Sequence, residues 1–213
     1  YSRTLITGAN NLNLLNNKLR VGFSYVNEND NEDKTIDFTL TDADKEILTR
    51  AGDDRFKAIK SGVQFVGRDT ATGLGKGLYI KSDTLINSEN ITVYKYLPND
   101  TNAVYQVTFS FVGQGKGNYL QKSSLEYNFN GLAQGNFDTI VFIPLPNAYQ
   151  IGDIKVKYES SPRREFTLDL ETAVSTLDAN KFSDVDDNNN SGLAFFGVLG
   201  LSKQNFNFLG AKL

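Results

Sequence analysis

Hydrophobic and polar residues alternate along much of this chain with the two-residue period of a β-strand, which places every second side chain on one face. One such series runs from Leu19 to Tyr25 and another from Leu168 to Val174. The pattern predicts a mainly β fold of antiparallel hairpins, arranged as an extended meander, a sandwich or part of a β-barrel. We predict strands at residues 3–9, 18–26, 63–68, 77–82, 91–97, 103–112, 118–129, 136–143, 151–159, 163–176, 192–202 and 205–213, with a brief extended segment at 35–40.

A small helical insert interrupts the strands at residues 42–60. Thr41 precedes Asp44 by three positions, which is the spacing of a capping box with Asp in place of the usual Glu. Gly52 is expected to end the first helix, and a second short helix is expected over residues 54–60. The insert is therefore predicted to dock one or two helices against a sheet.

A combination of glycine and aromatic residues occurs three times between residues 65 and 137. Glycine tolerates positive φ, so glycines between aromatic, β-favouring runs indicate tight or bulged hairpin turns. The aromatic residues are expected to pack across neighbouring strands. The predicted turn glycines are Gly67, Gly75, Gly77, Gly113, Gly115, Gly117, Gly131 and Gly135, and the predicted packing residues are Phe65, Phe111, Tyr119 and Phe137.

The glycine-rich run at residues 113–117 also invites comparison with a phosphate-binding loop. Such a loop needs a helix after it, and in nucleotide triphosphatases a Ser or Thr after the lysine. Lys116 is instead followed by Gly117 and then by a predicted strand that contains Tyr119. We therefore interpret the run as a hairpin turn.

Pro144 and Pro146 end a strand, because proline cannot donate a hydrogen bond within a sheet. Residues 144–150 are therefore the predicted boundary between a hairpin-rich region, residues 1–143, and a C-terminal β region, residues 151–213. The chain lacks Met at position 1 and ends inside a predicted strand, so we expect it to be part of a longer or processed protein.

Composition narrows the function classes. The chain has 213 residues, a net charge of −3, and neither Cys nor His, which removes disulfides, thiolate chemistry and the commonest general base. Lys and Arg are scattered, so nucleic acid is not an expected partner. No apolar run is long enough for a helical membrane span, but strands need only about 9–11 alternating residues, and the strands of residues 163–213 alternate in this way.

The strongest candidate for a metal site is an acidic loop, in which alternate side-chain oxygens of Asp184, Asp186 and Asn188 suit calcium. The helix–loop–helix calcium pattern fails, because its sixth position is Asn189 and its twelfth is Phe195. A solvated turn explains the same residues. Calcium is therefore an alternative to a plain turn, and the polar loop at residues 27–33 is a weaker candidate.

Two other chemistries have candidate residues. Asp169 and Glu171 share a strand face, as a pair of glycosidase carboxylates would, although a solvated face gives the same spacing. Aromatic side chains can stack on sugar rings, although cross-strand aromatic pairs are a commoner use. The tyrosines considered for sugar stacking are Tyr94, Tyr96, Tyr119 and Tyr127.

Several segments resemble large, β-rich, uncharacterised cell-envelope proteins of the Bacteroidota, Chlorobi and Ignavibacteria lineage, which are similar in style to the outer-membrane barrel of the type IX secretion translocon. The resemblance covers most of residues 18–213 and is carried by residues 104–119, 144–146, 150–153, 175–182 and 184–192. It implies a location in the outer membrane or at the cell surface of a Gram-negative bacterium. It supplies no catalytic residues.

Together these observations predict a non-enzymatic structural or interaction segment of an outer-envelope β-protein. Its partners would be the remainder of its own chain or other envelope subunits, joined through sheet edges and aromatic faces. A membrane contact through β-strands is part of this hypothesis. The alternatives are a carbohydrate-binding or adhesive surface module, stabilised by calcium, and a hydrolase with two facing carboxylates.

Overall fold

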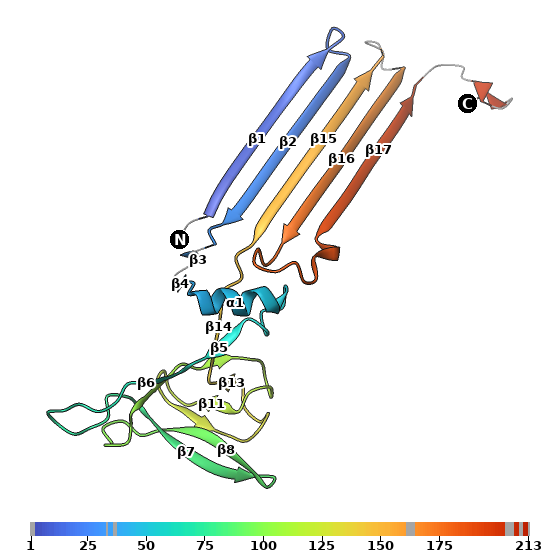
Figure 1. Cartoon of the computed structure of the whole chain (residues 1–213). Coiled ribbons are helices and arrows are strands. Elements are labelled where there is room, and N and C mark those ends of the chain that lie inside the picture. Colours follow the sequence, from blue (N-terminus) through green and yellow to red (C-terminus); the bar gives the residue numbers. More distant parts are fainter. Residues whose placement is uncertain are drawn as a thin grey trace. The chain divides into compact units, whose positions relative to one another are not determined.

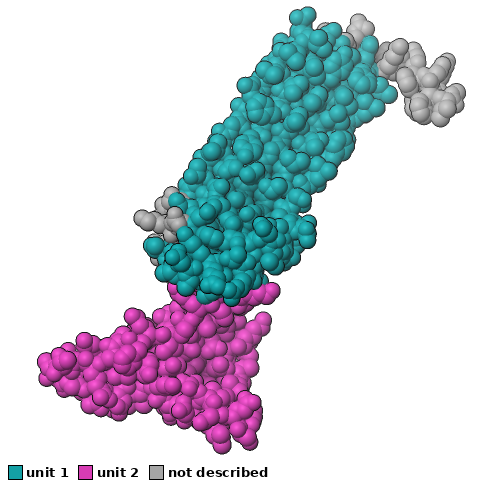
Figure 2. Space-filling model, in the orientation of Figure 1, with its two compact units in different colours: residues 1–54, 144–213 teal, residues 55–143 magenta. Residues whose placement is uncertain are grey.

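The computed structural model describes residues 3–32, 34–35, 38–160, 165–202, 207–208 and 211–212. The chain is mainly β, with antiparallel sheets and a single α-helix among the described residues. It forms two compact units, coloured separately in Figure 2. Unit 1 consists of residues 1–54 and 144–213, and unit 2 of residues 55–143.

This division differs from the predicted one. The boundary expected at residues 144–150 coincides with the end of unit 2, but residues 1–54 belong with the C-terminal part of the chain. The reason is that strand β2 (Leu19–Asp30) pairs with strand β15 (Ala148–Glu159) along almost its whole length. Unit 2 is therefore an insertion between two adjacent strands of one sheet.

Unit 1 is built on a five-stranded antiparallel sheet with the order β1-β2-β15-β16-β17 (Figure 1). Beside β2 and β15 it contains β1 (Arg3–Leu14), β16 (Phe166–Asp178) and β17 (Ser191–Leu201). The predicted alternation is confirmed, since Leu19 and Leu168 both lie opposite Tyr158 of β15 and so share a face with it. Among the described residues no sheet closes on itself: β1 and β17 are the edges of this one.

The first hairpin is longer than the sequence predicted. β1 continues through the Asn-rich stretch to Leu14, and its turn is at Leu15, Asn16 and Asn17, all with φ between 52° and 65°. Asparagine tolerates this left-handed conformation better than most residues, so Asn16 and Asn17 accommodate it at modest cost.

Helix α1 (Asp42–Ala51) confirms the predicted start and stop. The Thr41 hydroxyl accepts from the Asp44 backbone amide, and the Asp44 carboxylate accepts from the Thr41 amide, which is a complete capping box. Gly52, with φ 61°, ends the helix. The second helix was a wrong prediction, because residues 54–60 form turns that lead into a strand.

The remaining elements of unit 1 are short. They are β3 (Lys34–Thr35), β4 (Phe38–Thr39), the 3-10 turn η1 (Asp187–Asn189), β18 (Asn207–Phe208) and β19 (Ala211–Lys212). The predicted strand at residues 205–213 falls partly outside the described residues, and its described part is the β18–β19 pair.

Unit 2 consists of short strands in two four-stranded sheets, β6-β9-β7-β8 and β10-β13-β11-β12, and the pair β14-β5. The predicted strands at 103–112, 118–129 and 136–143 are each divided in two, because the chain passes from one sheet to another or turns back on itself. The bounds are β5 (Ile59–Ser61), β6 (Val63–Phe65), β7 (Tyr79–Ile86), β8 (Glu89–Tyr96), β9 (Tyr105–Val107), β10 (Ser110–Phe111), β11 (Tyr119–Gln121), β12 (Tyr127–Phe129), β13 (Phe137–Asp138) and β14 (Ile140–Phe142).

Aromatic rings form the core of unit 2. Phe109 lies between its two four-stranded sheets, with its ring centroid 5.3 Å from Tyr79, 4.9 Å from Tyr119 and 4.3 Å from the stacked ring of Tyr127. Tyr79 and Tyr119 are almost fully buried. Edge-to-face and offset pairs of this kind stabilise a core beyond the area they bury.

Candidate functional site

The five-stranded sheet has one strongly apolar surface, which we call the apolar face. Paired residues of adjacent strands point to the same side, so the register Phe23–Ile154–Thr172–Phe195 defines one row of this face. The large apolar and aromatic residues of the face are Ile6, Leu12, Leu14, Leu19, Val21, Phe23, Tyr25, Ile154, Val156, Tyr158, Phe166, Leu168, Leu170, Val174, Leu193, Phe195, Leu199 and Leu201.

No described element of unit 1 covers the apolar face. Leu193, Phe195 and Leu199 remain 76%, 70% and 62% exposed, and Phe23 and Ile154 in the interior of the sheet remain more than half exposed. The largest apolar patch on an ordinary soluble monomer is only about 300–600 Å². An uncovered face with this many large apolar side chains indicates an interaction surface.

The opposite surface, which we call the polar face, carries hydrophilic side chains that pair across β2, β15 and β16, although a few apolar residues also lie on it: Leu5, Leu177, Phe196 and Val198. Lys157 lies 3.3 Å from Asp169, and Lys155 lies 3.2 Å from Glu171. Ser24 donates a hydrogen bond to Asp153 on the same face. Each of the two carboxylates considered for glycoside hydrolysis thus faces a lysine, as on a solvated sheet surface.

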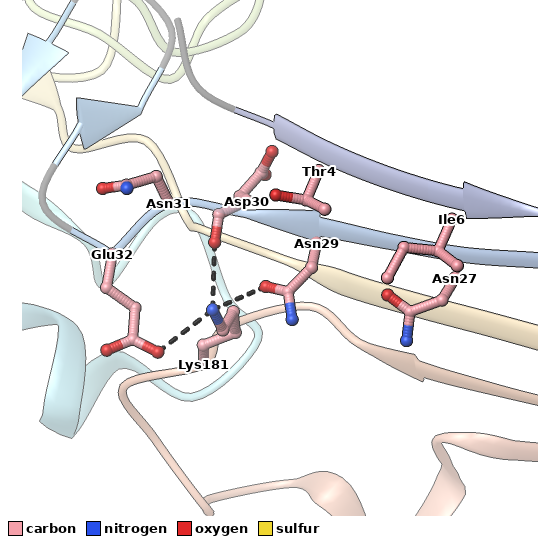
Figure 3. A pocket seen from close by; sticks show the side chains of 8 residues that line it. All are labelled: Thr4, Ile6, Asn27, Asn29, Asp30, Asn31, Glu32 and Lys181. Carbon is pink, nitrogen blue, oxygen red and sulfur yellow. Dashed lines mark hydrogen bonds and ion pairs between the residues drawn. The ribbon is translucent and has the colours of Figure 1, made fainter.

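An open polar pocket of about 460 Å³ lies where β1 and β2 meet the loop after β16 (Figure 3). Lys181 from that loop fills its centre, with Nζ 2.6 Å from Asn29 Oδ1, 2.9 Å from the Asp30 carbonyl oxygen and 3.0 Å from Glu32 Oε1. The ammonium group has three donors, and these three acceptors satisfy them. Lys181 therefore holds the loop after β16 against β2, and its ammonium group has no spare donor for a ligand.

Asp30, beside this pocket, is held by a second set of contacts. Arg3 Nε lies 2.6 Å from Asp30 Oδ1, and the Asn147 amide donates to Oδ2 at 3.1 Å. Burial alone would raise the pKa of Asp30, but the hydrogen bonds from Arg3 and Asn147 outweigh it and lower the pKa below its usual value. The contacts join β1, β2 and the start of β15, so they stabilise the sheet rather than prepare a reactive carboxyl.

The predicted calcium residues lie in the loop between β16 and β17. Asp184, Asp186 and Asn188 are all exposed, and Asp186 adopts a left-handed conformation with φ 76° just before η1. Among the described residues, no group of three or more His, Cys, Asp or Glu side chains is arranged to hold a metal ion. Because the proposed set contains only two carboxylates and an amide, the calcium site stays a prediction.

An acidic side chain that the sequence reasoning missed lies near that loop. Asp53 Oδ1 is buried and has no hydrogen-bond partner. Burial, followed by the charges of Asp187, Asp186 and Asp178, raises the pKa of Asp53. No sequence motif indicated Asp53, because the acidic residues that act on it lie in a segment more than 120 positions away.

The eight predicted turn glycines are of two kinds. Four have positive φ, as a turn requires: Gly67, Gly113, Gly115 and Gly131. The other four, also predicted as turn glycines, have no positive φ and lie where two backbones approach closely. A Cβ added to any of these would lie 2.2–2.4 Å from a backbone oxygen, and they are Gly75, Gly77, Gly117 and Gly135.

Tyr79 and Tyr119 each follow a close-approach glycine by two positions and bury a hydroxyl against another hairpin. The Tyr79 hydroxyl donates to the Leu125 carbonyl oxygen at 2.6 Å and accepts from the Tyr127 amide at 3.2 Å. The Tyr119 hydroxyl accepts from the Tyr94 amide at 2.9 Å. These bonds tie separate hairpins of unit 2 together, so the repeated motif supports packing.

The predicted aromatic packing residues differ in depth. Tyr119 is buried and Phe137 half-buried, whereas Phe65 and Phe111 are more than half exposed and make edge-to-face contacts with Tyr105 and Phe137. The tyrosines considered for sugar stacking all belong to ring pairs or to the core, and none is fully exposed: Tyr94, Tyr96, Tyr119 and Tyr127. Carbohydrate binding stays a prediction.

The glycine-rich run at residues 113–117 forms a tight turn, in which the Lys116 amide donates to the Gly113 carbonyl oxygen, and leads into strand β11 and not into a helix. The hairpin interpretation was wrong, because β10 and β11 both pair with β13 and not with each other. Within the described part of the chain, no helix has the length and apolar character needed to cross a bilayer. A scan of protein-family models and searches of curated proteins and of solved structures found no match to this chain.

Proposed function

We propose that the five-stranded sheet of unit 1 is a stretch of a membrane-embedded β wall in a bacterial outer envelope, with its apolar face toward lipid. The observation that carries the proposal is the concentration of large apolar side chains on one face of an uncovered sheet, with the charged side chains on the other. Residues of the apolar face, such as Leu193 and Phe195, point to one side, and Lys155, Lys157 and Asp169 point to the other. Strands of transmembrane barrels alternate in this way between lipid and a polar interior.

Strand length supports the same proposal. The five strands have 12, 12, 12, 13 and 11 residues in chain order. A tilted strand needs about 9–11 residues to cross the hydrocarbon core. Strands of ordinary soluble domains have a mode of about 5–6 residues, so strands of this length suit a bilayer better than a small soluble sandwich.

The two edge strands of the sheet indicate which partners a membrane-embedded sheet would require. In the described part of the chain, β1 pairs only with β2 and β17 only with β16, so two rows of backbone groups remain available. Lipid offers no hydrogen bonds, so each edge must pair with another strand before insertion. The expected partners are further strands of the parent protein or other envelope subunits, and the role is structural and non-enzymatic.

Adjacent phenylalanines of β17 provide a matched test. Phe195 belongs to the apolar face, and Phe196 points to the polar face, in register with Glu171. In lipid, Phe195→Arg should lower the stability of the inserted protein by about 2–4 kcal/mol, the cost of a midplane arginine facing lipid. Phe196→Arg should be tolerated, because its charge would meet water and a carboxylate.

The measurement is the fraction of the whole protein that floats with phospholipid vesicles and withstands protease, compared for the two variants. A large loss for Phe195→Arg alone is the expected result. Equal behaviour of the two variants would contradict the proposal. So would a parent protein that is folded and monomeric in plain buffer, because the apolar face would then be covered by protein instead of lipid.

A further inference from the structure

The two ends of the five-stranded sheet have very different connections. At one end, the turn end, residues 15–18 join β1 to β2 and residues 160–165 join β15 to β16. At the other end, the long-connection end, residues 179–190 join β16 to β17, and residues 31–147 join β2 to β15. Unit 2 belongs to this last connection, so it leaves and re-enters the sheet at the long-connection end.

The side chains of the apolar face are also distributed unequally between the two ends. At the turn end, the last complete row is apolar and aromatic throughout: Leu14, Leu19, Tyr158, Leu168 and Leu199. At the long-connection end, one row contains Asn27, Gln150, Thr176 and Ser191 beside Ile6. The strands therefore extend beyond their apolar band only at the long-connection end.

From these two observations we propose that the long-connection end is the extracellular end of the wall and that unit 2 is displayed on the cell surface. The proposal rests on the function proposed above. Transmembrane barrels of the outer membrane have short periplasmic turns and longer extracellular loops. A polar extension of the strands on one side matches strands that continue past the headgroups into the medium.

Unit 2 is suited to an exposed position because contacts among its own residues stabilise it. Its buried tyrosines bond to its own backbone, as Tyr79 does with Leu125 and Tyr127. Its hairpin tip at Asn87 and Ser88 is exposed. Chain connectivity alone places it on the side of the bilayer where β2 ends and β15 begins, whatever its orientation.

The absence of cysteine from this chain allows a direct test by single-cysteine labelling. Three variants of the whole protein, free of any other cysteine, probe three positions: Ser88→Cys in unit 2, Lys18→Cys in the β1–β2 turn, and Val174→Cys on the apolar face. Each is exposed in the structure. Intact cells are treated with a membrane-impermeant maleimide, before and after the outer membrane is permeabilised, and denatured protein gives the maximum labelling.

The expected result is labelling of Ser88→Cys in intact cells, labelling of Lys18→Cys only after permeabilisation, and loss of labelling of Val174→Cys in both conditions. Labelling of Lys18→Cys in intact cells, or protection of Ser88→Cys there, overturns the orientation while protection of Val174→Cys preserves the membrane wall. Labelling of Val174→Cys in folded protein overturns the proposed function itself, and with it the orientation.

Discussion

Asn180 donates a hydrogen bond of 2.8 Å from its side-chain amide to the carbonyl oxygen of Gly52, 128 positions earlier in the chain. The same nitrogen donates to the Leu48 carbonyl oxygen at 2.8 Å, and Asn180 is fully buried. The last carbonyls of a helix have no partner within it, so this side chain from the β16–β17 loop completes the C-terminal end of α1.

Replacement of this residue should therefore destabilise unit 1. Asn180→Ala leaves two buried carbonyl groups without a donor, and we expect the free energy of unfolding to fall by about 1–3 kcal/mol. Asn180→Asp should cost more, because a carboxylate cannot donate and repels both oxygens. Chemical denaturation measures both, with Asn190→Ala as a control in the same loop, where the bond to Asp187 is less buried. An unchanged midpoint for Asn180→Ala would refute this role.

The close approach of Gly117 to the backbone of Phe137 predicts a severe effect of a single methyl group. A Cβ at Gly117 would lie 2.4 Å from the Phe137 carbonyl oxygen, so Gly117→Ala must push two backbones apart. We expect a loss of about 3 kcal/mol or more, at the upper end for overpacking. Gly8→Ala is the control, because nothing lies within 4 Å of its Cβ. Thermal unfolding of both variants gives the comparison, and similar values for both would exclude the close-approach role.

Burial of the Tyr79 hydroxyl predicts how unit 2 responds to alkali. Burial raises the pKa of Tyr79 from 10.0 to about 12. The folded state thus holds this proton more tightly than the unfolded state, so the stabilisation is complete below pH 10 and is lost as the pH rises toward 12.

The urea midpoint should accordingly fall across this window, together with the appearance of phenolate absorbance. Tyr79→Phe should remove part of the fall. It should also lower stability by about 1–3 kcal/mol at neutral pH, because the Leu125 carbonyl and the Tyr127 amide lose their partner. Tyr25→Phe is the control, since the bond from Asn27 to its hydroxyl is exposed. A Tyr79→Phe profile that matches the parent chain would exclude this origin.

Asp53 predicts a substitution that stabilises the protein. Burial, followed by the charges of Asp187, Asp186 and Asp178, raises its pKa, so its ionised form is unfavourable in the folded state at neutral pH. Asp53→Asn should raise the melting temperature at neutral pH. The gain should shrink as the pH falls toward the ordinary carboxyl value of 3.8, because protonation then removes the same charge.

Thermal scans at several pH values test the Asp53 prediction. Asp184→Asn, at an exposed position of the β16–β17 loop, is the control and should change the melting temperature little. A gain for Asp53→Asn that does not vary with pH would assign the effect to something other than charge.

Local patterns determined much of this fold. Alternation assigns a residue to a face from its own neighbours, so the apolar series of β2, β16 and β17 followed from the sequence. The capping box of Thr41 and Asp44 is equally local, because both partners lie within one helical turn. The mainly β class and the hypothesis of membrane contact through strands therefore followed from the sequence itself.

Only the tertiary structure decided which segments meet. The pairing of β2 with β15 joins residues more than 100 positions apart, and no local signal specifies such a partner, so the predicted division at residue 143 missed the insertion of unit 2. A glycine that permits positive φ and one that admits a neighbouring backbone are the same residue in a sequence, as Gly115 and Gly117 illustrate. The distinction depends on what lies opposite, which requires the folded chain.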